Sequence, residues 1–160
     1  MDLIVNNPYR QLGLLVGASA KQESNHKTRI NQYIEAEQEI PNQYTEYGFE
    51  CLGKIQRTTN SISTAVSILN LDADKMKAAI FWFYNGNEIT DEPAFDALKE
   101  NEIDQAYLIW KKLTATGIVT AKNASAFNNL SNLYLSDIED ITDTSKYLYG
   151  FRNFSKIEIS

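Results

Sequence analysis

The only thiol and the only imidazole of this chain belong to Cys51 and His26, which together could form a nucleophile and its base. A thiol becomes reactive when an imidazole takes its proton and a third polar group holds the imidazole in place. The spacing of the two residues neither brings them together nor supplies the third group. A Cys-dependent hydrolase is therefore the least favoured hypothesis, and we expect an inert, buried Cys51 and an exposed His26.

Two groups of acidic residues could offer oxygen ligands to calcium. The first group is Asp72 with Asp74, and the second consists of Asp137, Glu139, Asp140 and Asp143. Both lack the loop glycine and the twelfth-position glutamate of an EF-hand. They are more typical of helix caps and first-turn charges, which interact favourably with the helix dipole. Since no Gly-rich phosphate loop follows a predicted strand, we expect no catalytic residue, no metal site and no cofactor.

The composition is that of a folded globular protein. Hydrophobic residues make up 43% of the 160 residues, which is enough for one well-buried core or two small helical units. The net charge of -6 argues against a nucleic-acid partner, whose phosphates need clustered Lys and Arg. The chain has a single cysteine, no secretory signal pattern and no apolar run of the ~20 residues that span a bilayer. These features favour a cytoplasmic protein without a membrane partner.

The first helices are predicted from turn and cap residues. Pro8 and Gly13 flank a short helical turn. Ser19 and Gln22 form a capping box, which begins a helix that we expect to run to about Glu37.

Residues 39–59 show no sustained helical or strand period and predict a long loop. Tyr44, Tyr47 and Phe49 favour an ordered loop, because mobile loops seldom carry so many aromatic side chains. Long ordered loops in compact domains are usually functional.

Helical periodicity becomes strong after this loop. The first stripe follows a cap at Thr59 or Asn60 and consists of Ile62, Ala65, Val66 and Leu69. The second follows a cap at Asp72, ends at residues 85–87 and consists of Met76, Ala79, Ile80 and Phe83. Residues 80–84 carry large apolar side chains on all sides of this predicted helix, which favours burial between the two halves of the chain.

The second half of the chain also predicts helices. Asp91 and Pro93 are typical of a helix start, with Pro in the first turn. The inward-facing residues of this helix are Ala94, Phe95 and Leu98. Asn101 and Asn123 are candidate caps of two further helices, and Gly117 ends the first of them. We expect a last helix over residues 142–151 and only a weak strand pattern at residues 155–159.

The first half resembles a DnaJ-type J-domain. The run Tyr-Arg-Gln-Leu-Gly-Leu at residues 9–14, followed by Ala18 and Ser19, is similar to the opening of that family. Residues 62–69 and 72–77 resemble its third helix and its short fourth helix. The family's His-Pro-Asp motif, which triggers ATP hydrolysis in a DnaK-type chaperone, is missing.

The second half resembles a tetratricopeptide-type helix pair, over residues 101–110 and 126–134. One pair is fewer than the roughly three repeats that such folds need, so it would have to pack on the first half or on another chain. The combination of a degenerate J-like start with such a pair is similar to uncharacterised bacterial proteins of unknown activity.

These resemblances lead to one fold prediction and two leading functional hypotheses. We expect an all-α protein with a J-domain-like bundle in residues 1–87 and a tetratricopeptide-like region in residues 88–160, packed as one unit. The first hypothesis is a non-catalytic adaptor that binds a protein partner. The alternative is an atypical co-chaperone that engages a DnaK-type chaperone without His-Pro-Asp. The candidate partner-binding residues are Lys21, Lys27, Arg29, Tyr44 and Tyr47.

Overall fold

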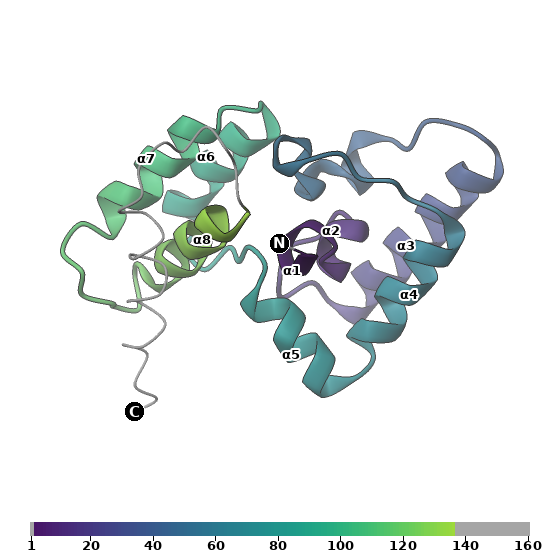
Figure 1. The fold of residues 1–160 in the computed structure, drawn as a ribbon, viewed down its shortest axis with the longest axis horizontal. Helices are drawn as coiled ribbons and strands as arrows, with labels where there is room; N and C mark the ends of the chain where they lie inside the picture. The colour runs from purple at the N-terminus through teal and green to yellow at the C-terminus, as the bar shows by residue number, and fades with distance from the viewer. Residues whose placement is uncertain (1, 137–160) are drawn as a thin grey trace.

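All regular elements in the described part of the chain are helical, so the predicted all-α class is confirmed (Figure 1). The computed structural model describes residues 2–136. Its helices are α1 (Asp2–Val5), α2 (Pro8–Gln11), α3 (Ala20–Glu35), α4 (Thr59–Leu69), α5 (Asp72–Ile80), α6 (Glu88–Lys99), α7 (Ile103–Leu113) and α8 (Ala124–Leu135). Three single 3₁₀ turns lie between α3 and α4: η1 (Asn42–Tyr44), η2 (Glu46–Gly48) and η3 (Glu50–Leu52). The helix predicted at 142–151 and the strand pattern at 155–159 lie outside the described residues.

Helices α3 and α4, the two longest helices of the first half, lie side by side (Figure 1). The predicted capping box of α3 is confirmed, since Ser19 and Gln22 each bind the backbone of the other. Neither predicted cap of α4, Thr59 or Asn60, is correct, because Thr58 forms the cap with Ser61 and the helix starts one or two residues earlier. On α5, Lys75 reaches back to Glu23 of α3 with 2.8 Å between Nζ and Oε1.

The predicted apolar face of α5 is wrong. Met76 is 66% exposed and Ile80 43% exposed, whereas Ala78 is buried. The helix ends at Ile80, and Leu71 rather than Asp72 occupies its N-cap position. The short helix packs on α2 and α4 through the Ala78 side, so Met76 and Ile80 of the predicted stripe point to solvent. Ala79 is half-buried, and Phe83 is buried but lies beyond the end of the helix.

Residues 81–87 are not helical, although the prediction that their aromatic side chains are buried is correct for Trp82 and Phe83. The polar side chains of α8 hold this segment by its backbone. Asn129 accepts from the Tyr84 amide and donates to the Tyr84 carbonyl, both at 2.8 Å. Asn132 donates to the Trp82 carbonyl at 2.7 Å. These bonds replace the intrahelical ones that a continuous helix would have made.

The start of α6 also differs from the prediction. Its N-cap is Asn87, so Asp91 lies within the first turn instead of ahead of the helix, and Pro93 is inside the helix. The fully buried Asp91 carboxylate accepts from the Gly86 amide at 3.1 Å, the Asn87 amide at 3.0 Å and the Trp110 indole N–H at 3.1 Å. It therefore caps the backbone ahead of α6 and ties this helix to α7.

Asn101 is not the cap of the next helix. It has a left-handed φ of 61°, and Glu102 occupies the N-cap position of α7. Asn123 is at the predicted N-cap position of α8, and Gly117 follows α7 with a φ of 69°. The residues predicted to face inward from α6, Ala94, Phe95 and Leu98, are completely buried, and so is Trp110 of α7.

One continuous apolar core runs through both halves of the chain. Its centre is aromatic, and Phe49 from the loop between α3 and α4 is one of the side chains that join the halves. The Phe49 ring stacks on Phe95 of α6 at 5.9 Å between centroids and contacts the ring of Phe83 at 5.4 Å. In the second half α6 packs on α7 and α7 packs on α8.

Candidate functional site

Cys51 and His26 do not form a pair in the structure. The Cys51 thiol donates to the Leu98 carbonyl of α6 at 3.4 Å. The Nδ1 atom of His26 lies 2.7 Å from the Leu12 carbonyl, and its ring packs edge-on against Tyr44. Among the described residues no hydrogen bond joins the thiol to the imidazole. Burial raises the pKa of the Cys51 thiol to about 11, which keeps it protonated at neutral pH.

This raised pKa gives a prediction for alkylation. At pH 8 the native Cys51 should react with iodoacetamide about a hundredfold more slowly than the unfolded chain, because only the thiolate attacks.

The raised pKa of Cys51 should also make the stability of the protein depend on pH, since the unfolded thiol ionises at lower pH than the folded one. The stability that Cys51 contributes is therefore lost as pH rises from about 9 to about 11.

The matched control for this pH dependence is Cys51→Ala, which has no thiol to ionise. The difference in unfolding free energy between the two proteins should shrink as pH rises through that range. A difference that stays constant from pH 8 to pH 11 would contradict the raised pKa.

The basic residues predicted to bind a partner all lie on α3. Lys21 and Arg29 are exposed, and Lys27 is half-buried. At about 100° per residue, Lys27 points about 160° away from Arg29, so the three cations do not share one face. Arg29 already donates to the Gln32 side chain at 3.3 Å.

The loop that carries Tyr44 and Tyr47 packs on the helices instead of projecting from them. Tyr44 is half-buried, with its ring against His26, and Tyr47 is half-buried against Phe95. A packed loop favours a structural role for both tyrosines.

Two arginines hold this loop in place through backbone carbonyls. Arg10 of α2 is completely buried, and its guanidinium donates to the carbonyls of Gly48 at 2.8 Å, Val5 at 2.9 Å and Phe49 at 3.2 Å, and to the Gly53 carbonyl. Arg57 donates back to the Gln11 carbonyl at 2.8 Å. The sequence analysis did not predict this role for either arginine, because Arg is usually exposed.

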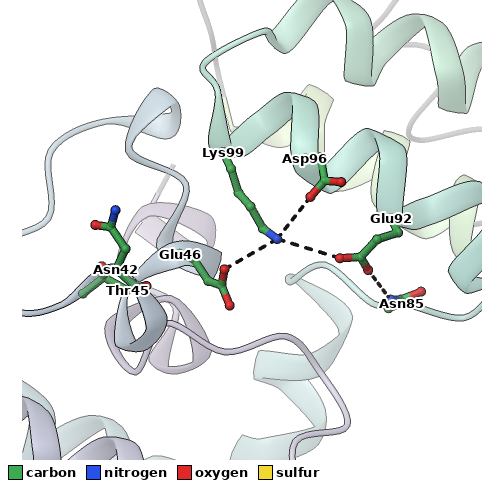
Figure 2. A network of polar contacts seen from close by, with 7 residues as sticks. All are labelled: Asn42, Thr45, Glu46, Asn85, Glu92, Asp96 and Lys99. Carbon is green, nitrogen blue, oxygen red and sulfur yellow. Dashed lines mark hydrogen bonds and ion pairs between the residues drawn. The ribbon is translucent and has the colours of Figure 1, made fainter.

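Lys99 joins the loop to α6 in a cluster of charges (Figure 2). Its ammonium lies 3.3 Å from Asp96, 3.6 Å from Glu46 and 3.8 Å from Glu92, and 4.6 Å above the Tyr47 ring. Three carboxylates surround one ammonium, so the cluster is acidic overall. Its carboxylates are 40% to 63% exposed and therefore well solvated.

Replacing Lys99 with methionine should lower the unfolding free energy by about 0.5–1 kcal/mol at low salt, since exposed ion pairs contribute little. Most of this loss should disappear at about 1 M salt, where charges are screened over a few ångströms. Urea unfolding at both salt concentrations measures the effect, and Lys54→Met, at an exposed loop lysine, is the control. An equal loss at high salt would mean that the aliphatic stem, and not the charge, provides the contact.

A hollow of about 260 Å³ lies on the surface where α1, α2, α4 and α5 meet. Its apolar lining comes from Leu3, Pro8, Ile68, Ala78 and Phe81, and its polar lining from Asn6, Asn7, Asp74 and Lys77. The sequence contains no local signal for this hollow, because four separate segments build it.

The polar residues of the hollow differ in what remains available to a ligand. The Asn7 side chain is buried and donates to the Ala78 carbonyl at 2.9 Å and the Phe81 carbonyl at 3.2 Å. Asp74 and Lys77 are exposed on successive turns of α5. The hollow thus has an apolar floor and a charged rim. Its volume is below the roughly 300–1,000 Å³ of typical small-molecule pockets and suits a few side chains of a partner.

Residues 2–136 contain no group of three or more His, Cys, Asp or Glu side chains arranged to hold a metal ion. Within the same range, no helix is long and apolar enough to cross a bilayer. Comparison of the chain with protein-family models, with curated proteins and with solved structures gives no match.

Proposed function

We propose that this protein is a non-catalytic helical adaptor that binds a protein partner through the hollow between α1, α2, α4 and α5. The observation that carries the proposal is the combination of an apolar lining with the exposed Asp74 and Lys77 on the rim. Protein interfaces have this arrangement, in which a desolvated centre receives a few anchor side chains and a polar rim surrounds it. Leu3, which is 37% exposed, extends the apolar lining to the surface.

Photo-crosslinking from inside the hollow tests this proposal. A photoreactive phenylalanine analogue at position 3 should give one dominant crosslinked protein in cells of the source organism. The same analogue at Leu108, a 55% exposed position on α7, is the matched control and should not give that product. Exchanging the rim charges with Asp74→Lys and Lys77→Asp should remove the crosslink at position 3. Equal products from both positions, or a product that survives the charge exchange, would refute a docking site in the hollow.

The order of elements in the first half favours a second candidate function, a co-chaperone that engages a DnaK-type chaperone without His-Pro-Asp. The first half contains the short α2, the long α3, a loop, the long α4 and the short α5, in that order. The J-domain resemblance implies the same order. The exposed Lys21 and Arg29 of α3 are the candidate contacts.

An ATPase assay separates the two functions. If the purified protein at micromolar concentration accelerates ATP hydrolysis by the DnaK-type chaperone of its host, and Lys21→Glu with Arg29→Glu abolishes the effect, the co-chaperone function holds. Unchanged hydrolysis leaves the adaptor as the proposed function.

A further inference from the structure

The α7–α8 end of the molecule differs in charge from the rest of the chain. No Asp or Glu occurs from Gln105 to Ser136, although the chain contains 21 acidic residues. The same stretch carries three lysines, Lys111, Lys112 and Lys122, and therefore has a net charge of +3 within a protein of net charge -6. The connection between α7 and α8 lies at the edge of the molecule, away from α1 to α5 (Figure 1).

Three exposed β-branched side chains belong to the start of α6 and to the α7–α8 connection. Ile89 is 87% exposed, Ile118 is 67% exposed and Val119 is 44% exposed. Ile89 belongs to the first turn of α6, and the other two belong to the α7–α8 connection. The Asn87 side chain donates to the Lys122 carbonyl at 3.2 Å, which holds the start of α6 against that connection.

The α7–α8 connection is pre-shaped by Asn123. Its side-chain nitrogen donates to the carbonyls of Leu113 at 3.2 Å and Ile118 at 3.1 Å. Its side-chain oxygen accepts from the Thr120 amide at 2.7 Å. These bonds fix the backbone around the exposed pair, so little conformational entropy remains to be lost when the connection binds a surface.

The charges nearby indicate what kind of surface this is. Neither Lys112 nor Lys122 forms an ion pair within the described residues. We call Lys112, Ile118, Val119 and Lys122 the patch. Protein interfaces are depleted in Lys and rely on Tyr, Trp and Arg as anchors, and the patch contains none of these three residue types. Lys beside exposed apolar side chains is typical of contacts with anionic membrane surfaces.

We propose that this end docks onto an anionic lipid surface, with Ile118 and Val119 entering the headgroup region and Lys112 and Lys122 facing the lipid charges. Glu88, next to Ile89, is acidic and opposes this contact. The sequence-based expectation of no membrane partner rested on the lack of a spanning segment, and a surface contact needs none. The proposal concerns a different face from the hollow and is independent of it.

Vesicle flotation with the full chain tests the proposal. The protein should float with phosphatidylcholine vesicles that contain about 30% phosphatidylserine, and not with pure phosphatidylcholine, at about 50 mM salt. Ile118→Ser with Val119→Ser should lower partitioning about tenfold or more, because the inserted apolar area is lost. Lys112→Glu with Lys122→Glu should abolish flotation, and Glu88→Gln should strengthen it.

The matched controls are Met76→Ser, at a 66% exposed apolar position on α5, and Lys54→Glu, at an exposed loop lysine. Both should float like the unmodified protein, and circular dichroism should show the same unfolding temperature for all variants. Flotation that is absent, equal with both lipids, or equal in the patch and control variants overturns the proposal. Binding to an acidic polypeptide without binding to vesicles would also overturn it, in favour of a protein partner.

Discussion

Replacing Arg10 with methionine is expected to lower the free energy of unfolding by about 3–5 kcal/mol, because several buried carbonyls lose their donor together. The guanidinium binds Val5, Gly48, Phe49 and Gly53 and is completely buried. Burial lowers its pKa to about 10, so it stays charged at neutral pH, and its hydrogen bonds to these carbonyls offset the loss of solvent. Chemical denaturation followed by tryptophan fluorescence measures the loss.

Two further variants show whether the geometry of the guanidinium is what matters. Arg10→Lys keeps the positive charge but cannot reach carbonyls on several sides at once, so it should recover only a minor part of the loss. Arg29→Met, at an exposed arginine on α3, should stay within about 0.5 kcal/mol of the unmodified protein. If Arg10→Met were no worse than Arg29→Met, the aromatic side chains alone would hold the loop.

Replacing Phe49 with alanine should cost about 3–5 kcal/mol, since a buried ring leaves a cavity at the junction of the two halves. The ring is 1% exposed and touches Trp82, Phe83 and Phe95. The backbone of Phe49 has a φ of 46°, a left-handed conformation that glycine adopts with less strain than any other residue.

The left-handed φ gives Phe49 a signature that separates it from an ordinary core residue. Phe49→Gly should be about 1 kcal/mol less destabilising than Phe49→Ala, because both lose the ring and only glycine relieves the strain. The matched control is Phe127, which is 6% exposed on α8. There the order should reverse, with glycine about 1 kcal/mol worse than alanine in a helix. The same order at both positions would contradict a strained Phe49 backbone.

The sequence predicted most of what depends on neighbours along the chain. The capping box of Ser19 and Gln22 is present, and the stripe through Ile62, Ala65 and Leu69 is buried. These patterns were readable because helix caps and helix faces depend on residues three or four positions apart. The burial of Trp82 and Phe83 was also predictable, since large apolar side chains leave water wherever the backbone allows it.

Only the tertiary structure decided the conformation of residues 81–87, the start of α6 and the face that α5 buries. Asn129 binds the backbone of Tyr84, and Asp91 binds the amides ahead of α6, through contacts between segments far apart in the sequence. Such contacts override local propensity, because a buried backbone group left without a partner costs more than a change of helix boundary.

The candidate binding site also depends on contacts between segments that lie far apart in the sequence. The hollow is built from α1, α2, α4 and α5, and Ala78 and Leu3 line it only because α5 packs against the N-terminal helices. The sequence by itself determined an all-α protein with an apolar core and most of its helices, since those depend on local periodicity and total apolar content. The packing of these helices decided which apolar residues stay exposed, because each helix buries only the face that contacts its neighbours.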